Sequence, residues 1–236
     1  MGKIKAIIFD MDGILVDSEV SARECMKKCA HKRSLPFEDS FYELFLGCND
    51  EMSFKILNNR YHNEKLVQEM MEEFEELALK EYEDGKIGLK KGCKEIIGYL
   101  QERNIPYALA TGSSFKFVEM DFLNNGYDEV PFEYVVSGER IKNSKPHPEI
   151  FIRAAGLMNI NVKDCLIIED SPKGIEAAFR AGACSCLIPD LATPTEEMIK
   201  KSSFRCDDLF GAIDLIENLI IQCANSNFYR DFSHHI

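Results

Sequence analysis

Near its N-terminus the chain has a short apolar run that ends in two carboxylates, a pattern that limits both the fold and the chemistry it can support. Residues 7–9 (Ile-Ile-Phe) have the pattern of a buried β-strand, and Asp10, Asp12 and Gly13 follow directly. A strand that carries Asp10 to a sheet edge, with a turn that returns Asp12 beside it, would place a nucleophile next to an acid or base. The alternative is a strand that ends in a solvated acidic turn.

Beyond residue 87, short apolar runs alternate with segments of helical periodicity. This alternation is typical of a mostly parallel sheet with helices on both faces. We therefore predict an α/β, Rossmann-like core. The predicted strands are residues 4–9, 106–110, 134–137, 165–169 and 184–188.

Apolar side chains at helical spacing indicate the helices of this core. They fall into three groups: Ile96, Ile97 and Leu100; Phe115, Val118 and Phe122; and Leu209, Ile213, Ile216 and Ile220. Two further helices are indicated by their first residues, because a hydroxyl residue followed by proline is typical of a helix start. These starts are Thr193-Pro194 and Ser171-Pro172.

Residues 19–83 carry several helical patterns and no convincing strand. Three glycines, Gly85, Gly88 and Gly92, stand where the chain would return to the sheet, and a hinge there is one interpretation. We predict a core domain of residues 1–18 and 87–236, with an all-helical domain of residues 19–86 inserted after the first strand.

Charge and hydropathy narrow the range of partners and locations. The 28 basic and 40 acidic residues give a net charge of −12, which argues against a general nucleic-acid or anionic-membrane surface. No apolar run is long enough to span a bilayer, and the N-terminal residues lead into a strand pattern rather than a signal peptide. We predict a cytoplasmic protein.

The chain has nine cysteines, an odd number without the paired spacings of a zinc site. The closest pairs, Cys25 with Cys29 and Cys184 with Cys186, lack further ligands nearby. We interpret most of the cysteines as small buried side chains in a reducing compartment.

Three more polar sites follow predicted strands, and open α/β sheets bind ligands at the carboxyl ends of their strands. Thr111 and Gly112 offer a hydroxyl and a backbone amide that an anion can approach closely. Lys145 stands in a proline-held turn, and Glu169-Asp170 is an acidic pair. Taken singly, each has a structural alternative: a turn former, a surface ion pair and a helix-capping pair, respectively.

Together these residues resemble the haloacid dehalogenase superfamily over nearly the whole chain. The four motifs of that superfamily occur here in order: D-x-D-G-x-x-x-D from Asp10, a hydroxyl residue at Thr111, K-P-x-P from Lys145, and E-D at Glu169-Asp170. The resemblance implies the α/β fold predicted above, with the helical insert serving as a small cap over the site.

The resemblance also implies a role for each residue. Asp10 would attack phosphorus and form an aspartyl-phosphate, and Asp12 would protonate the leaving alcohol and later activate water. Thr111, Gly112 and Lys145 would bind the phosphate.

The metal of this family would be Mg²⁺, held by Asp10, Glu169, Asp170 and the backbone carbonyl of Asp12. A cation is needed because a phosphate about 4 Å from a carboxylate is repelled by roughly 4 kcal/mol per charge pair at a dielectric near 20.

Three residues bear on the activity within the superfamily. The acid at Asp12 favours phosphate esters, because dehalogenases lack it. In β-phosphoglucomutases the cap carries a His and an Arg where this chain, aligned without gaps, has Ala22 and Asp50. Asp50 has two interpretations, a helix N-cap or a residue that disfavours a second phosphate.

We therefore predict a Mg²⁺-dependent phosphatase that acts on a small phosphorylated metabolite, namely a sugar, polyol or nucleoside phosphate. The alternatives are a sugar phosphomutase and a non-catalytic regulatory module. A membrane or nucleic-acid partner is not expected.

Overall fold

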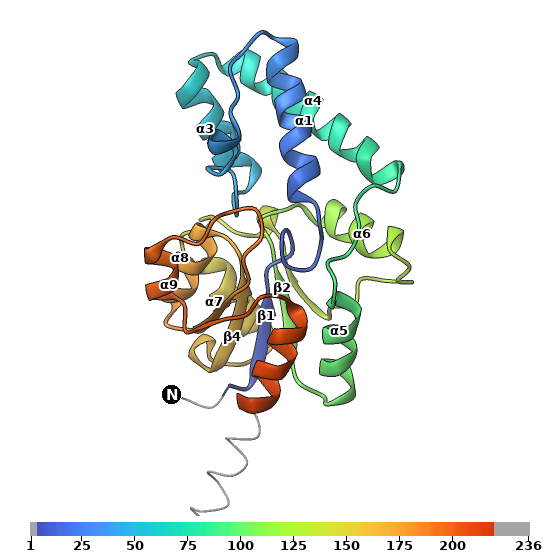
Figure 1. The fold of residues 1–236 in the computed structure, drawn as a ribbon, viewed down its shortest axis with the longest axis vertical. Helices are drawn as coiled ribbons and strands as arrows, with labels where there is room; N and C mark the ends of the chain where they lie inside the picture. Colours follow the sequence, from blue (N-terminus) through green and yellow to red (C-terminus); the bar gives the residue numbers. More distant parts are fainter. Residues whose placement is uncertain (1–3, 220–236) are drawn as a thin grey trace, which may run out of the picture.

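The computed structural model describes residues 4–219 (Figure 1). Its centre is a six-stranded parallel sheet with the order β3-β2-β1-β4-β5-β6. Because β1 lies between β2 and β4, the carboxyl ends of these three strands are neighbours at one sheet edge. The strands are β1 (Ala6–Phe9), β2 (Tyr107–Ala110), β3 (Tyr134–Val136), β4 (Cys165–Glu169), β5 (Cys184–Leu187) and β6 (Phe204–Arg205).

Helices cover both faces of the sheet, so the predicted α/β fold is confirmed. The core helices are α5 (Cys93–Glu102), α6 (Phe115–Asn124), α7 (Glu149–Leu157), α8 (Pro172–Ala181), α9 (Glu196–Lys201) and a helix that begins at Leu209. Side chains alternate along β1, as strand geometry requires. Ile7 and Phe9 pack with α5, α6 and the helix from Leu209, whereas Ala6 and Ile8 pack with α7 and α8.

The predicted strands agree with the structure to within two residues at each end. The short edge strand β6 was not predicted, since two residues carry no periodicity. The predicted helix start at Ser171 is confirmed: its side chain accepts a hydrogen bond from Gly174 N. The start at Thr193 is wrong, because Thr195 caps α9 by accepting from Met198 N. Ile220 lies outside the described residues.

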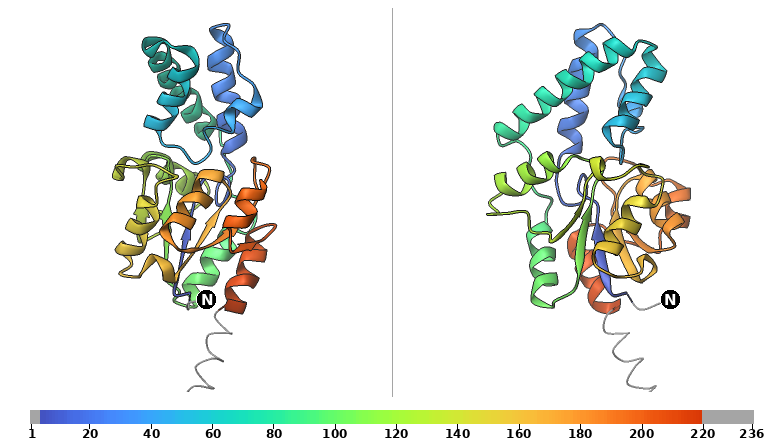
Figure 2. Two further views of the ribbon diagram at one scale, coloured as in Figure 1. Left: turned by 90° about the vertical axis from the view of Figure 1, so that its left-hand side faces the viewer. Right: turned by 180° about the vertical axis from the view of Figure 1, so that it is seen from behind.

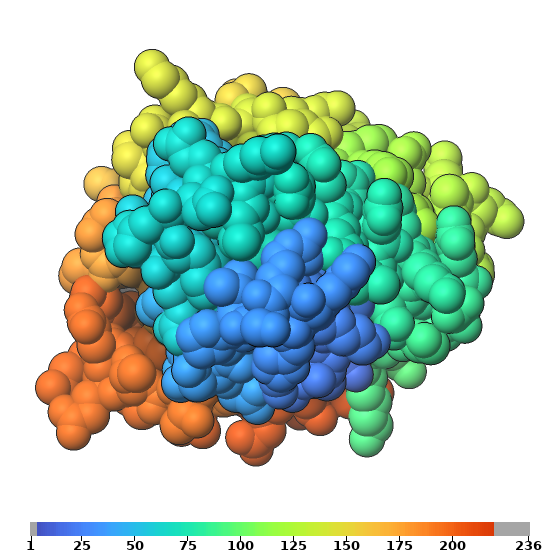
Figure 3. Space-filling model, turned by 90° about the horizontal axis from the view of Figure 1, so that it is seen from above, coloured from blue at the N-terminus to red at the C-terminus, as the bar shows by residue number. Residues whose placement is uncertain are grey.

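Residues 19–83 form four helices above the carboxyl edge of the sheet, which we call the cap (Figures 1 and 2). They are α1 (Glu19–Lys32), α2 (Asp39–Tyr42), α3 (Asp50–Tyr61) and α4 (Glu64–Glu83). Most of their buried apolar side chains form one cluster, which Ala192 of the core joins and which is separate from the clusters of the sheet. Seen from above, the cap covers the middle of the molecule and the core surrounds it (Figure 3).

The two segments that join cap and core run side by side. Asp17 N donates to Gly88 O at 2.9 Å, and Lys90 N donates to Leu15 O at 2.8 Å. Val16 and Leu89 form an antiparallel bridge between these hydrogen bonds. The chain therefore leaves and re-enters the core at a single two-stranded junction.

Two further predictions concern membranes and cysteines. None of the helices between residues 4 and 219 combines the length and apolar character that crossing a membrane requires. Eight cysteines are free thiols, and Cys223 lies outside the described residues. Within the described chain, the one cluster of metal-ligating groups is formed by carboxylates and includes no cysteine.

Candidate active site

The predicted site residues meet at the carboxyl edge of the sheet. Asp10 follows β1 and donates its backbone N–H to Ile168 O on β4 at 3.0 Å. Thr111 follows β2 and donates in the same way to Val136 O on β3 at 3.0 Å. Glu169 is the last residue of β4. Parallel pairing thus brings together residues that are more than a hundred positions apart.

Lys145 lies buried between two carboxylates, with only 1% of its surface exposed. Its Nζ is 2.7 Å from Asp10 Oδ1 and 2.6 Å from Glu169 Oε1. Burial alone would lower the pKa of Lys145, but the charges of Asp10 and Glu169 raise it above its usual value. Lys145 is therefore a cation. Because it is buried, it is not the surface ion-pair partner that was the alternative interpretation.

The acidic groups outnumber this cation. One carboxylate oxygen from each of Asp10, Glu169 and Asp170 lies within 4.8 Å of the others. Burial, with smaller contributions from Glu169 and Asp12, raises the pKa of Asp10 to about 7 against the opposing effect of Lys145. Burial and then the charge of Glu169 also raise the pKa of Asp170 well above its ordinary value. The cluster therefore holds three carboxyl groups and one cation, which leaves it short of positive charge.

A hard divalent cation fits this cluster. Asp170 Oδ2 is buried and has no hydrogen-bond partner in the described part of the chain. Such an orphaned oxygen is costly unless another group binds it. Three carboxylates are also the donor type that Mg²⁺ prefers. Asp10, Glu169 and Asp170 are therefore suited to hold such an ion.

Two glycines make room for these carboxylates. A Cβ at Gly13 would lie 2.5 Å from Asp170 Oδ2, and Gly13 also has a φ of +79°. A Cβ at Gly174 would lie 1.7 Å from Glu169 Oε1. Ser171 holds the other oxygen, since its N and Oγ donate to Glu169 Oε2 at 2.7 and 3.0 Å. The orientation of Glu169 is thus determined by the start of α8.

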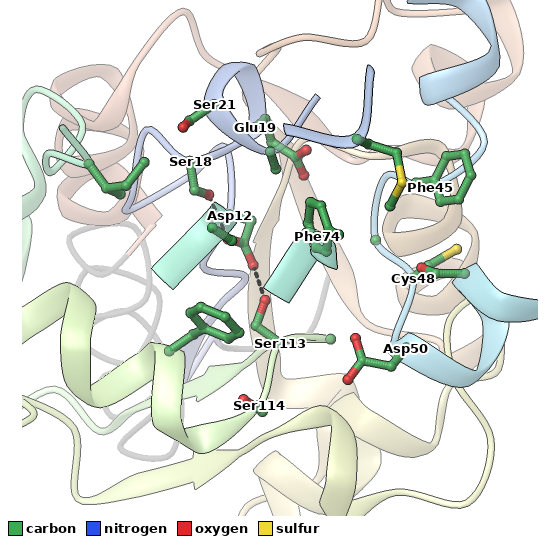
Figure 4. A pocket seen from close by; sticks show the side chains of 18 of the residues that line it. Asp12, Ser18, Glu19, Ser21, Phe45, Cys48, Asp50, Phe74, Ser113 and Ser114 are labelled. Carbon is green, nitrogen blue, oxygen red and sulfur yellow. Dashed lines mark hydrogen bonds between the residues drawn. The ribbon is translucent and has the colours of Figure 1, made fainter. Parts of the chain in front are cut away.

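Three hydroxyl groups hold Asp12. Ser18 Oγ donates to Asp12 Oδ1 at 2.6 Å, and Ser113 Oγ donates to Oδ2 at 2.7 Å (Figure 4). Thr111 Oγ1 is 3.3 Å from the same Oδ2 and accepts from Ser113 N at 3.0 Å. Ser18 and Ser113 were not among the predicted site residues. Each could have been inferred from its position, because Ser18 directly follows the motif that ends at Asp17 and Ser113 directly follows Thr111-Gly112.

Gly112 lies where the core meets the cap. A Cβ there would be 2.5 Å from the backbone oxygen of Cys48, in the loop before α3. A Cβ at Gly138 would be 2.0 Å from the oxygen of Gly112. Glycine is therefore required for the close approach of three backbone segments, and Gly112 also borders the cavity.

A cavity of about 150 Å³ lies between core and cap. Asp10, Asp12 and Ser113 line its core side. The cap contributes mainly apolar, hydroxyl and acidic side chains, and no Lys, Arg or His lies among the described lining residues. Ala22 lines the cavity, as expected if it occupies the place of the mutase histidine.

The interpretation of Asp50 as a helix N-cap is wrong. Asn49 caps α3, because its Oδ1 accepts from Met52 N at 3.1 Å. Asp50 is the first helical residue and lines the cavity. Its carboxylate extends from α3 toward the side of the cavity that carries Ser113 and Ser114 (Figure 4).

Known proteins that resemble this chain in sequence or in structure include two phosphatases and a β-phosphoglucomutase. A phosphorylated carbohydrates phosphatase of Thermotoga maritima is 28% identical over 182 residues, which cover 76% of this chain and 82% of that protein. A probable pseudouridine-5'-phosphatase of Drosophila melanogaster is 29% identical over 201 residues, with 80% and 83% covered. The crystal structure of a β-phosphoglucomutase from Clostridium difficile has a TM-score of 0.76 at 25% identity, covering 92% of this chain and 99% of that one.

The sequence model of one family, haloacid dehalogenase-like hydrolase, matches residues 7–188. This match contains Asp10, Thr111, Lys145 and the Glu169-Asp170 pair, the residues on which the predicted resemblance rests. The chain belongs to the haloacid dehalogenase-like hydrolases.

Proposed function

We propose that this protein is a Mg²⁺-dependent phosphatase that hydrolyses a small phosphomonoester through an aspartyl-phosphate on Asp10. The observation that carries the proposal is the buried ion cluster. Lys145 bridges Asp10 and Glu169, and Asp170 presents an orphaned oxygen beside them. An arrangement with more acidic than basic groups that borders a cavity suits a metal ion and a phosphate better than it suits a purely structural role.

In the proposed reaction, Asp10 attacks phosphorus while the bond to the leaving alcohol breaks. Asp12 donates a proton to the leaving oxygen, and then takes a proton from the water that hydrolyses the aspartyl-phosphate. The hydroxyls of Ser18 and Ser113 hold the Asp12 carboxyl where it faces the cavity. Lys145 offsets the charge of the phosphate, while Thr111 and the Gly112 amide hydrogen-bond its oxygens.

The residues that would hold the ion are Asp10, Glu169, Asp170 and the backbone carbonyl of Asp12. A bound Mg²⁺ would supply positive charge against the phosphate oxygens and the acidic cluster. In this proposal residues 19–86 act as a cap that excludes water from the site, and the paired segments around Val16 and Leu89 act as its hinge.

Two observations support a phosphorylated sugar, polyol or nucleoside as the substrate and water as the acceptor. The related phosphatases described above are named for a phosphorylated carbohydrate and a phosphorylated nucleoside. Of the residues described around the cavity, none is a cation that would hold the second phosphate of a bisphosphate. Transfer of the phosphoryl group to water is thereby favoured over a mutase reaction.

The proposal is tested by phosphate release from a panel of phosphorylated metabolites that includes p-nitrophenyl phosphate. We expect release with Mg²⁺, none with excess EDTA, and recovery when Mg²⁺ is restored. A mutase would instead yield isomerised sugar phosphate and need a bisphosphate activator. Activity that is unaffected by EDTA would contradict the metal assignment, and hydrolysis of no member would favour a non-catalytic module.

A further inference from the structure

Glu19, which the proposed mechanism does not use, is a buried acid on the wall of the cavity. It is the first residue of α1, where the chain enters the cap, and only 8% of its surface is exposed. Tyr42 Oη donates to Glu19 Oε2 at 2.8 Å. Glu19 Oε1 has no hydrogen-bond partner among residues 4–219. The residue lines the same cavity as Asp12 (Figure 4).

The surroundings hold Glu19 in place and favour its protonated form. Tyr42 is buried and stacks on Phe45, with 5.8 Å between ring centroids. The charges that act on Glu19 are the carboxylates of Asp12, Asp10 and Asp190, and no ion pair forms with it in the described chain. Burial first, and then Asp12, raise the pKa of Glu19 to about 8. A protonated carboxyl offers both a donor and an acceptor.

A purely structural Glu19–Tyr42 pair is the simpler explanation, but it engages only one of the two carboxyl oxygens. Oε1 is not among the fully buried atoms that lack a partner, so this oxygen faces the open space of the cavity rather than the protein interior. Glu19 borders the space that a leaving group would occupy beside Asp12. A hydroxyl in that space would complete the hydrogen bonding of Glu19.

We propose that Glu19 determines specificity by hydrogen-bonding a hydroxyl of an uncharged leaving group, such as that of a polyol or monosaccharide phosphate. This inference rests on the proposed phosphatase function. Phe74 and Phe117 supply apolar surface for the carbon skeleton, and Ser21 and Ser53 supply further hydroxyls. An anionic leaving group would meet the Asp50 carboxyl without a compensating cation among the described lining residues.

The volume of the cavity agrees with a small leaving group. About 150 Å³ lies between core and cap. In another protein a cavity of that order accommodates one benzene ring. A single sugar ring or a short polyol has a comparable size, whereas a leaving group with a second phosphate is both larger and charged.

The test compares hydroxylated and non-hydroxylated substrates. Wild type, Glu19→Ala and Glu19→Gln are assayed with Mg²⁺ on sorbitol 6-phosphate, ribitol 5-phosphate, fructose 1-phosphate, fructose 1,6-bisphosphate and p-nitrophenyl phosphate. Glu24→Ala is the matched control, because Glu24 lies on the same helix but outside the cavity. Thermal unfolding of each variant reports on folding.

For the best hydroxylated monophosphate, we expect Glu19→Ala to lower kcat/KM at least ~10-fold more than it does for p-nitrophenyl phosphate. Glu19→Gln retains a neutral donor and acceptor and should recover most of that difference. Glu24→Ala should leave the ratio of the two substrates at its wild-type value. Wild type should prefer the monophosphates to the bisphosphate.

Other results overturn the inference. Equal losses of Glu19→Ala on both substrates would assign Glu19 a structural or general catalytic role, and no loss on either would assign it none. Wild-type hydrolysis of p-nitrophenyl phosphate but of none of the hydroxylated compounds would refute the inference and leave the phosphatase proposal standing. Hydrolysis of no compound would refute the phosphatase proposal and this inference with it.

Discussion

The core and the cap present polar groups to the same cavity in different ways. In the core, Asp10 and Glu169 are almost completely buried, and each lies within hydrogen-bond distance of the buried Lys145. In the cap, Glu19 lies on α1 and Asp50 lies on α3, and the two carboxyl groups share no hydrogen bond in the described chain. The core therefore holds one rigid charged cluster, whereas the cap holds separate polar groups on an otherwise apolar wall.

The contrast separates the residues that we expect to carry the chemistry from those that we expect to select the substrate. A charged cluster that depends on distances below 3 Å tolerates no substitution without loss of its charge balance. The cap residues that line the cavity can be substituted one at a time, since each would contact a different part of a bound substrate. We expect variants of the core cluster to affect all substrates and variants of the cap wall to affect some.

The largest expected effect comes from Asp10→Asn. The amide cannot attack phosphorus, so phosphate release should fall by ~10⁴-fold or more on every substrate that the wild type hydrolyses. Far-UV circular dichroism should show a folded protein, because the amide oxygen can still accept from Lys145. A residual rate above about 1% of the wild type would remove Asp10 from the nucleophile role.

A smaller effect is expected from Ser113→Ala, which tests whether Asp12 needs its hydroxyl partners. Hydrogen bonds to a charged group contribute about 1.5–3 kcal/mol, so kcat should fall by roughly 10- to 100-fold on all substrates. Ser114→Ala is the matched control, because Ser114 lines the cavity without bonding Asp12. The orienting role of Ser113 would be refuted if the two variants behaved alike in steady-state kinetics.

The smallest effect concerns stability where the core meets the cap. Asp121 on α6 is fully buried, and neither of its carboxyl oxygens has a hydrogen-bond partner in the described chain. Burial first, and then the charge of Asp12, raise the pKa of Asp121 to about 8 from an ordinary value of 3.8. The folded protein therefore holds this proton more tightly than the unfolded chain.

The sign of the pH dependence follows from this shift. The contribution of the protonated Asp121 carboxyl is complete below pH 3.8, and it is lost progressively as the pH rises to about 8. Asp121→Asn cannot lose a proton. Relative to wild type, its free energy of unfolding should gain about 1–3 kcal/mol between pH 6 and pH 9.

Urea unfolding at the two pH values measures this gain. Asp128→Asn, an exposed change in the loop after α6, serves as the control and should show no such gain. A difference between Asp121→Asn and wild type that stays constant with pH would mean that Asp121 is already ionised in the folded protein at pH 6.

Much of the site in the core was predictable because the order of the parallel strands places its residues side by side. Asp10, Thr111 and Glu169 follow or end apolar runs, and parallel strands gather their carboxyl ends at one edge. Lys145 was predictable only through its motif, since its burial between two carboxylates depends on the loop that carries it. Ser113 was not predicted as a site residue, because a serine in a loop has many ordinary structural roles.

The cap was harder to predict in detail, as Asp50 and Glu19 illustrate. Helical periodicity indicated that residues 19–83 are helical, yet it does not determine how a helix is rotated about its axis relative to a neighbouring domain. An N-cap was expected at Asp50, but the backbone places Asn49 there and turns Asp50 toward the cavity. The burial of Glu19 against Tyr42 likewise depends on how α1 packs on α2.

The class of fold, the inserted helical segment and the acidic pair after the first strand could all be read from the amino-acid sequence. Those properties follow from local periodicity and from motifs that lie at strand ends. The side chains that share the cavity became visible only in the folded chain: Ser18 and Ser113 on Asp12, Glu19 and Asp50 on the wall, and no cation among the described lining residues. The reason is physical, because these contacts depend on the orientation of the cap over the sheet, which no local pattern encodes.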